Sequence, residues 1–195
     1  MASKKRDRLI RVASNIFFRQ GFHATGVDAV IKKSRVAPMT LYTQFKSKEN
    51  LILAALERED KQLREGLVAE VRRRATTPVG QLLAIFEVFG EKFTSPGFYG
   101  CAFMKASCEY PSLDHPIHKL AAKHKAMVRS FMRELAREAG AEDPEKLSKQ
   151  LFLLLEGALT DAQVSGQAGA GNEARAAAEV LALGAIPKEK RNVSD

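Results

Sequence analysis

The sequence predicts an all-α fold, in which a small N-terminal unit of three helices is followed by a larger helical region. Apolar residues recur at three- and four-residue steps along most of the 195-residue chain, as they do on the buried face of a helix. Gly and Pro mostly fall between these segments, where they end one helix or open the next. The length gives ample material for a hydrophobic core, in one compact unit or two small ones.

The first predicted helix covers residues 8–20. We expect Gly21 to end it, because Gly adopts the left-handed conformation that commonly follows a helix, and Phe22 to pack back onto it. The apolar residues that define its buried face are Leu9, Val12, Ala13, Ile16 and Phe17.

Two short helices joined by a tight turn are predicted between residues 25 and 48. Thr25 and Asp28 have the spacing of a capping box, so Thr25 is expected to cap the first of them. Residues 34–37 form the turn, and Ala37 or Pro38 opens the second helix. Two apolar residues four apart anchor that helix inward, Leu41 and Phe45. A helix held in this way, with small or polar side chains outward, suits the DNA major groove, so the pattern predicts a helix-turn-helix.

The same residues resemble the TetR family of bacterial regulators. The matching motifs are Thr-x-Val-Asp at residues 25–28, Thr-Leu-Tyr at 40–42 and Phe-Lys-Ser-Lys-Glu-Asn-Leu at 45–51, and they cover about the first quarter of the chain. The family usually has Gly where this chain has Arg35, because the backbone there favours a positive φ. Arg can occupy that region at a cost of about 1 kcal/mol.

The helix-turn-helix gives two sets of expected DNA contacts. Phosphate contacts position a protein on the duplex, whereas contacts to base edges read the sequence. We expect phosphate contacts from Thr25, Tyr42, Lys46 and Lys48. We expect base contacts from Pro38, Met39, Thr40, Thr43 and Gln44, with Gln44 suited to adenine.

Positive charge is concentrated at the N-terminal end. Residues 1–48 hold eleven Lys or Arg and two Asp, a net +9, whereas the whole chain carries +8. A basic end joined to a near-neutral remainder is typical of nucleic-acid binding, and a merely solvated basic surface explains less because the charge coincides with the helix-turn-helix. Lys4, Lys5 and Arg6 either extend into a minor groove or form a frayed end with diffuse phosphate contacts.

Beyond the turn, Ser47 is a good N-cap for a long helix running towards Arg74, shared by both parts of the chain. Thr76-Thr77-Pro78 then ends the helical pattern. Further helices are expected over residues 81–93, 101–110 and 114–139. Two more are expected, one from residue 144 to a Gly-rich turn at 166–171 and one that Asn172 caps. The expected domains are a helix-turn-helix domain in 1–48, a helical effector-binding and dimerisation domain in 49–187, and a disordered tail in 188–195.

The resemblance implies a small-molecule effector bound in the middle of the chain. Pockets for such ligands are mostly apolar and form between helices, although each apolar residue here is also explained as plain core. The candidate lining is Phe86, Phe89, Phe93, Phe103, Met104, Cys108, Met127 and Phe131, with Glu109, Tyr110 and His118 as conceivable polar anchors.

The resemblance also implies a homodimer formed through the last two helices. The helix from residue 144 carries a second apolar face at Phe152, Leu155 and Leu159, so one face can line the core while the other needs a partner. A wholly intramolecular bundle is the alternative. The expected interface residues are Leu147, Leu151, Leu154, Ala158, Ala177 and Leu181.

Other site chemistry is not predicted. Cys101 and Cys108, if helical, lie ~10 Å apart, beyond the ~7 Å limit for a disulfide. His115, His118 and His124 lack partners with metal-ligand spacing, so surface or cap roles are expected, with no metal and no cofactor. The sequence contains no nucleophile elbow and no pair of catalytic carboxylates, so an enzyme is not expected. No apolar run reaches the ~18–20 residues of a membrane span, and no secretory signal is recognised, so no membrane partner and a cytoplasmic location are expected.

These observations predict a sequence-specific transcriptional regulator. We expect a homodimeric repressor that binds a palindromic double-stranded DNA operator and is released by a small apolar or amphipathic effector. The alternatives are a ligand-independent or activating regulator, or one that responds to thiol redox chemistry at Cys101 or Cys108. An enzyme or a non-specific nucleic-acid-binding protein are rivals from other classes.

Overall fold

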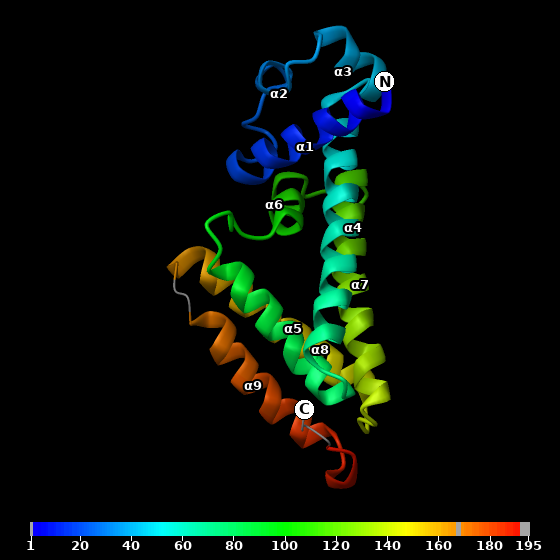
Figure 1. Cartoon of the computed structure of the whole chain (residues 1–195), viewed down its shortest axis with the longest axis vertical. Coiled ribbons are helices and arrows are strands. Elements are labelled where there is room, and N and C mark those ends of the chain that lie inside the picture. Colours follow the sequence, from blue (N-terminus) through cyan, green and yellow to red (C-terminus); the bar gives the residue numbers. More distant parts are fainter. Residues whose placement is uncertain (1, 167–168, 192–195) are drawn as a thin grey trace. The chain divides into compact units, whose positions relative to one another are not determined.

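The computed structural model describes residues 2–166 and 169–191, and over these residues the secondary structure is entirely helical (Figure 1). The predicted all-α class is therefore confirmed. The helices are α1 (Ala2–Gln20), α2 (Val27–Ser34), α3 (Pro38–Phe45), α4 (Lys48–Arg74), α5 (Pro78–Phe93), α6 (Ala102–Glu109), α7 (Pro116–Glu138), α8 (Pro144–Ser165), α9 (Ala170–Ala185) and the 3-10 turn η1 (Lys188–Lys190).

The chain folds into two compact units, and each contains residues from two separate parts of the sequence. The first unit combines the residues up to Leu63 with Cys101–Lys125, and the second combines Arg64–Gly100 with the residues from Ala126 onward. The first unit thus takes α6 as well as the three N-terminal helices, so its border differs from the functional boundary expected after residue 48. Helices α4 and α7 each begin in the first unit and end in the second.

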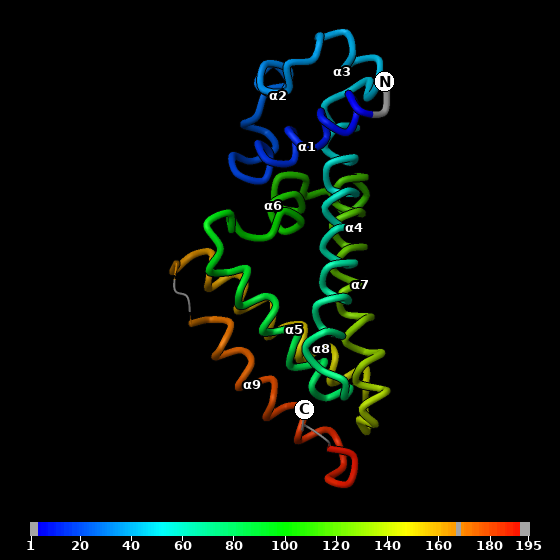
Figure 2. Tube along the Cα trace, viewed as in Figure 1, coloured from blue at the N-terminus to red at the C-terminus, as the bar shows by residue number. Residues whose placement is uncertain are grey.

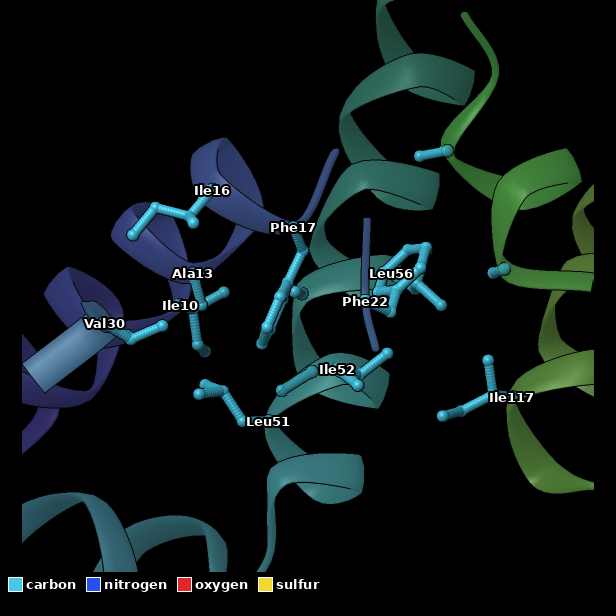
Figure 3. Close-up of a cluster of buried hydrophobic side chains, with 14 of the residues drawn as sticks. Ile10, Ala13, Ile16, Phe17, Phe22, Val30, Leu51, Ile52, Leu56 and Ile117 are labelled. Atoms are coloured by element: carbon cyan, nitrogen blue, oxygen red, sulfur yellow. The ribbon is translucent and has the colours of Figure 1, made fainter. Parts of the chain in front are cut away.

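The first unit has a core built from α1, α2, α3, α4, α6 and α7. Figure 3 shows side chains from several of these elements pointing toward one another, among them Phe17, Phe22 and Leu56. Phe22 is fully buried with its ring centroid 5.8 Å from that of Phe17, which confirms that it packs back onto α1. Burying a Phe side chain contributes about 1.5–3 kcal/mol, so these rings hold the N-terminal helices firmly on α4.

Local signals set most helix ends as expected. Gly21 ends α1 with φ +94°, and its N–H donates to the Phe17 carbonyl oxygen. The Ser47 hydroxyl oxygen accepts from the Asn50 N–H at 3.1 Å, so Ser47 caps α4, which runs to Arg74. Thr77 and Asp143 cap α5 and α8 in the same way.

The predicted starts of α1 and α9 were wrong. Helix α1 begins at Ala2 and not at Arg8, because no helix breaker precedes Arg8. The guanidinium of Arg6, within this first part of the helix, lies 5.3 Å over the Phe45 ring. The stretch Lys4–Arg6 is therefore helical rather than an arm or a frayed end. Asn172 does not cap α9, since the N-cap is Gly169 and Asn172 lies inside the helix.

The expected disordered tail and Gly-rich turn are covered only in part. Within the expected tail, Lys188–Lys190 form the turn η1, which differs from the prediction. Residues 192–195 of the tail, and residues 167–168 of the turn, lie outside the described residues. Gly166, at the start of that turn, has φ +68° and ends α8.

In the second unit, α9 packs against both α5 and α8 (Figures 1 and 2). Two glycines let α5 and α9 approach closely, since a Cβ built at Gly171 would lie 2.5 Å from the Cα of Gly90. Arg175 of α9 also reaches Glu87 of α5 at 2.6 Å. In the part of the chain that the structure describes, no helix combines the length and apolar content needed to cross a membrane.

Candidate nucleic-acid interface

Thr25 does not cap α2, contrary to the capping-box prediction. The N-cap of α2 is Gly26, which makes no side-chain cap hydrogen bond. The Thr25 side chain instead turns inward, is 2% exposed and donates its hydroxyl to the Gly21 carbonyl oxygen at 2.7 Å. With its hydroxyl used in this way, Thr25 fixes the path of the chain between α1 and α2 rather than presenting its side chain to a phosphate.

The turn between α2 and α3 contains the unusual residue noted in the sequence. Arg35 follows α2 with φ +53° and ψ +40°, the left-handed conformation that favours Gly. Its N–H donates to the Lys32 carbonyl oxygen at 3.4 Å. Val36 packs partly buried against the core of the first unit. Ala37 is the N-cap of α3 and Pro38 its first residue, as the sequence predicted.

Helix α3 is anchored by Leu41 and Phe45, both buried as predicted. The opposite side is open. Met39 is 75% exposed and Tyr42 is 48% exposed, and the other expected base-contacting residues are exposed or half-buried: Pro38, Thr40, Thr43 and Gln44. The Thr43 hydroxyl donates to the Met39 carbonyl oxygen at 2.7 Å, but this bond leaves its acceptor lone pairs for another group.

The basic residues expected on phosphates follow directly after α3. Lys46 is exposed and has φ +64°, where the chain turns from α3 towards α4. Lys48 is half-buried, and its ammonium donates to the His23 carbonyl oxygen at 3.2 Å. An ammonium has three donors, so Lys48 can hold this carbonyl and still bind a phosphate.

Helix α6 braces the segment between α1 and α2 from inside the first unit. The Lys105 ammonium donates to the Phe18 carbonyl oxygen at 3.0 Å, near the end of α1. The Glu109 carboxylate accepts from the N–H groups of Phe22 at 2.9 Å and His23 at 2.5 Å. Burial lowers the pKa of Lys105. The sequence reading missed this role, although Lys105 and Glu109 stand four apart, as two residues on one helical face do.

The three conceivable polar anchors for an effector, Glu109, Tyr110 and His118, are all engaged within the first unit. Glu109 holds the chain between α1 and α2, as described above. The buried ring of Tyr110 lies 4.7 Å from that of His23, and His118 Nδ1 lies 2.9 Å from the Tyr110 carbonyl oxygen. These residues serve as structural contacts, so the idea that they anchor an effector is not supported.

His124 was expected at the surface or in a cap, and that expectation was wrong. It is buried, with Nδ1 2.7 Å from Asp60 Oδ1, and its ring stacks on Phe103 at 3.7 Å. His115 is half-buried, stacks on Tyr110 and lies 3.8 Å from Glu49. Among the described residues, no three His, Cys, Asp or Glu side chains come together to hold a metal ion.

The predicted effector-pocket residues fall in both units. In the second unit, Phe86 and Phe93 are buried, while Phe89, Met127 and Phe131 are half-buried. In the first unit, Phe103 is fully buried core, Met104 is half-buried and Cys108 is exposed. Cys101 caps α6, its Sγ accepting from the Met104 N–H at 3.4 Å, and both cysteines are free thiols.

The apolar seam expected on α8 faces the core of the second unit. Leu147, Leu151 and Ala158 are buried within the unit, whereas Leu154 is half-buried. On α9, Ala177 is exposed and Leu181 half-buried. The apolar residues that face outward are different ones, Leu153 at 71%, Val164 at 81% and Val180 at 72% exposed. A hollow of about 470 Å³ lies between α8 and α9, lined by residues that include Leu153, Leu154, Gly157, Ala170 and Ala174.

A helix-turn-helix whose second helix presents small and polar side chains, carried on a basic unit, defines a DNA-binding protein. Residues 9–55 match the family described as bacterial regulatory proteins, tetR family, and residues 78–178 match the tetracyclin repressor-like C-terminal domain. The chain belongs to the TetR family of bacterial transcriptional regulators. It is a regulator and not an enzyme.

One curated relative is similar over nearly the whole chain, and another over less than half of it. The HTH-type transcriptional regulator YjdC of Escherichia coli (strain K12) is 27% identical over 178 residues, covering 91% of this chain and 93% of YjdC. The HTH-type transcriptional activator FasR of Mycolicibacterium smegmatis is 35% identical over 86 residues, 44% of this chain and 39% of FasR.

Solved structures show the same fold. A TetR-family transcriptional regulator from Streptomyces coelicolor has a TM-score of 0.89 at 29% identity, covering 95% of this chain and 97% of that one. A tetR-type transcriptional regulator from Streptomyces avermitilis has a TM-score of 0.80 at 28% identity, covering 93% and 97%.

Proposed function

We propose that this regulator is a homodimeric repressor, which binds a palindromic operator and is released by a small apolar or amphipathic ligand in the cytoplasm. The observation that carries the DNA-reading part is the arrangement of α3. Leu41 and Phe45 are buried, whereas the side that includes Met39 is open. Because one helix fits the major groove, this side is the one that can reach base edges.

Within this proposal, the side chains divide into two roles. Pro38, Met39, Thr40, Thr43 and Gln44 read bases, with Met39 and Pro38 offering apolar contact to thymine methyl groups and Gln44 a bidentate amide to adenine. Tyr42, Lys46 and Lys48 bind backbone phosphates on either side. Thr25 supports them indirectly, by its bond to the Gly21 carbonyl oxygen.

Dimerisation through α8 and α9 is supported by their exposed apolar residues. Leu153, Val164 and Val180 all lie on these two helices and are more than two-thirds exposed. Exposed apolar patches on soluble proteins commonly mark interaction sites. A two-fold symmetric dimer presents two α3 helices to a palindromic operator, whose half-sites lie ~34–36 Å apart or a multiple of that distance, one or more turns of the DNA.

Release by a ligand is proposed as a population shift. Phe89, Met127 and Phe131 of the second unit are only half-buried and offer apolar contact to such a ligand. A ligand that prefers a conformer with wrongly spaced α3 helices lowers operator affinity by its differential binding energy, typically ~1–3 kcal/mol. Activation is the alternative to repression, since the relative FasR is an activator.

The test is binding to genomic fragments that flank the protein's own gene, at ~0.15 M salt with random competitor DNA. Selective retention of a fragment with a palindrome supports a sequence-specific regulator, and transcription from that fragment in vitro then separates repression from activation. Equal retention of all fragments, lost together as salt rises, contradicts the proposal. Sedimentation of the protein alone and on the fragment tests the dimer.

A further inference from the structure

A hollow in the first unit is lined by basic side chains from two elements. Lys4, Lys5 and Arg8 come from the first turns of α1, and Arg35 comes from the turn before α3. Val36 and Ala37 complete the lining, and the hollow has a volume of about 270 Å³. This volume is many times that of one water molecule, so it has room for a tetrahedral anion. Of these four residues, Arg8 and Arg35 had no predicted role on DNA, whereas Lys4 and Lys5 were expected to enter a minor groove or to make diffuse phosphate contacts.

The lining that the structure describes contains four basic side chains and no carboxylate. Among the residues that the structure describes, none of Lys4, Lys5, Arg8 and Arg35 forms an ion pair with a carboxylate. Like charges gathered around one space repel each other. An anion placed between them removes this repulsion and gains charge-assisted hydrogen bonds, so the hollow favours an anionic ligand.

Arg35 is held in this position against its own backbone preference. Its left-handed conformation is strained for a residue other than Gly, and residues held in such conformations cluster at functional sites. A glycine would relieve the strain but would bring no charge. The planar guanidinium of Arg binds two phosphate oxygens at once, which gives a reason for Arg at a place where the backbone favours Gly.

We propose that this hollow binds one phosphate group of the DNA backbone, next to the groove that α3 enters. The inference rests on the proposed DNA-binding function and adds Lys4, Lys5, Arg8 and Arg35 to its contacts. The position favours DNA over a free anion, because Ala37 of the lining is the N-cap of α3 and Pro38, the next residue, is the first of the helix. A phosphate held here lies beside the bases that the start of α3 reads.

The experiment compares Arg35→Gly, Arg35→Lys and the double variant Arg8→Ala/Arg35→Gly with the wild-type protein. Lys123→Ala serves as the control, since it removes an exposed charge of the first unit away from the hollow. Affinity for a fragment flanking the gene and for a random duplex is measured from ~0.05 to ~0.3 M salt. Thermal unfolding of each variant is recorded with and without inorganic phosphate.

The proposal expects Arg35→Gly to fold at least as stably as the wild-type protein, because the turn loses its strain. It expects weaker binding to both duplexes, by roughly tenfold for the loss of a charge-assisted contact. Because three cations remain in Arg35→Gly, the double variant is the decisive test of phosphate binding. The slope of log K against log salt for the double variant is expected to fall by about one per protomer. Arg35→Lys keeps most of the affinity, and Lys123→Ala changes neither affinity nor slope.

If the double variant binds DNA with the same affinity and the same salt slope as the wild-type protein, the proposal is overturned. If inorganic phosphate stabilises the wild-type protein but not the double variant while DNA binding is unchanged, the hollow takes a free anion and the DNA assignment is wrong. If the wild-type protein binds both duplexes equally, the specific-repressor function fails, but the slopes on the random duplex still decide whether the hollow binds DNA phosphate. Binding to neither duplex overturns both proposals.

Discussion

The carboxylate of Glu109 accepts a hydrogen bond from the backbone N–H of His23 at 2.5 Å, which ties α6 to the chain between α1 and α2. The His23 carbonyl oxygen accepts from the Lys48 ammonium at 3.2 Å, at the start of α4. His23 therefore stands between an α6 carboxylate and a residue proposed to bind phosphate. Glu109 thus helps to hold the segment whose carbonyl oxygen binds Lys48.

We expect Glu109→Ala to weaken operator binding and to lower stability. Two backbone N–H groups lose a charged acceptor, and hydrogen bonds to charged groups contribute about 1.5–3 kcal/mol each. Denaturant unfolding and operator affinity measure the two effects. Glu134→Ala is the matched control, because Glu134 pairs with Arg133 and Arg137 at the surface of α7, where such pairs contribute about 0–1 kcal/mol. Equal effects of the two substitutions would contradict a bracing role for Glu109.

Gln44 and Lys48 should give different signatures on DNA. Gln44→Ala is expected to change which operator variants bind best, because a bidentate amide contributes about 1–3 kcal/mol of discrimination at one base. Lys48→Ala is expected to weaken operator and random DNA alike and to lower the salt slope by about one. Binding titrations against a set of single-base operator variants separate the two. A uniform loss for Gln44→Ala would remove it from the base-reading residues.

Because α5 and α9 approach closely, we expect one added methyl group between them to lower the free energy of unfolding. In Gly171→Ala, the new Cβ lies 2.5 Å from the Cα of Gly90, and since this Cα belongs to the backbone and cannot swing aside, the helices must move apart. Overpacking of this kind costs about 1–3 kcal/mol, measured by denaturant unfolding at fixed protein concentration. Gly66→Ala, inside α4 with no neighbour within 4 Å, should instead be neutral or stabilising. The interpretation fails if both variants are equally stable.

The lowered pKa of Glu91 predicts how the stability of the protein changes in acidic solution. The hydrogen bond from Arg74 lowers the pKa of Glu91 below its ordinary value of 4.5. A carboxyl whose folded-state pKa is lowered stabilises the fold above the unfolded-state pKa, and that stabilisation disappears as the pH falls through the folded-state pKa. We therefore expect Glu91→Gln to be less stable than wild type above pH 4.5, with a difference that shrinks in more acidic solution. Denaturant unfolding across this range tests it, and a difference independent of pH would contradict it.

Local features of the sequence determined the helices and the reading face of α3. Gly21, Ser47 and Thr77 set helix ends through bonds to groups within four residues, so their effect is visible in the sequence. The spacing of Leu41 and Phe45 likewise defined which side of α3 is buried. The motifs around them were sufficient to indicate the TetR family, which the matches over residues 9–55 and 78–178 confirm.

Only the tertiary structure decided which of several compatible partners each residue meets. Thr25 has the spacing of a cap but bonds to Gly21, and Glu109 reaches residues 86 and 87 positions away in the sequence. Helix α8 has more than one apolar stripe, and its packing in the second unit, not its periodicity, left Leu153 and Val164 outside. Capping and periodicity depend on nearby residues, whereas burial and long-range hydrogen bonds depend on which helices pack together. That choice is made by the free energy of the whole core, which no single segment contains.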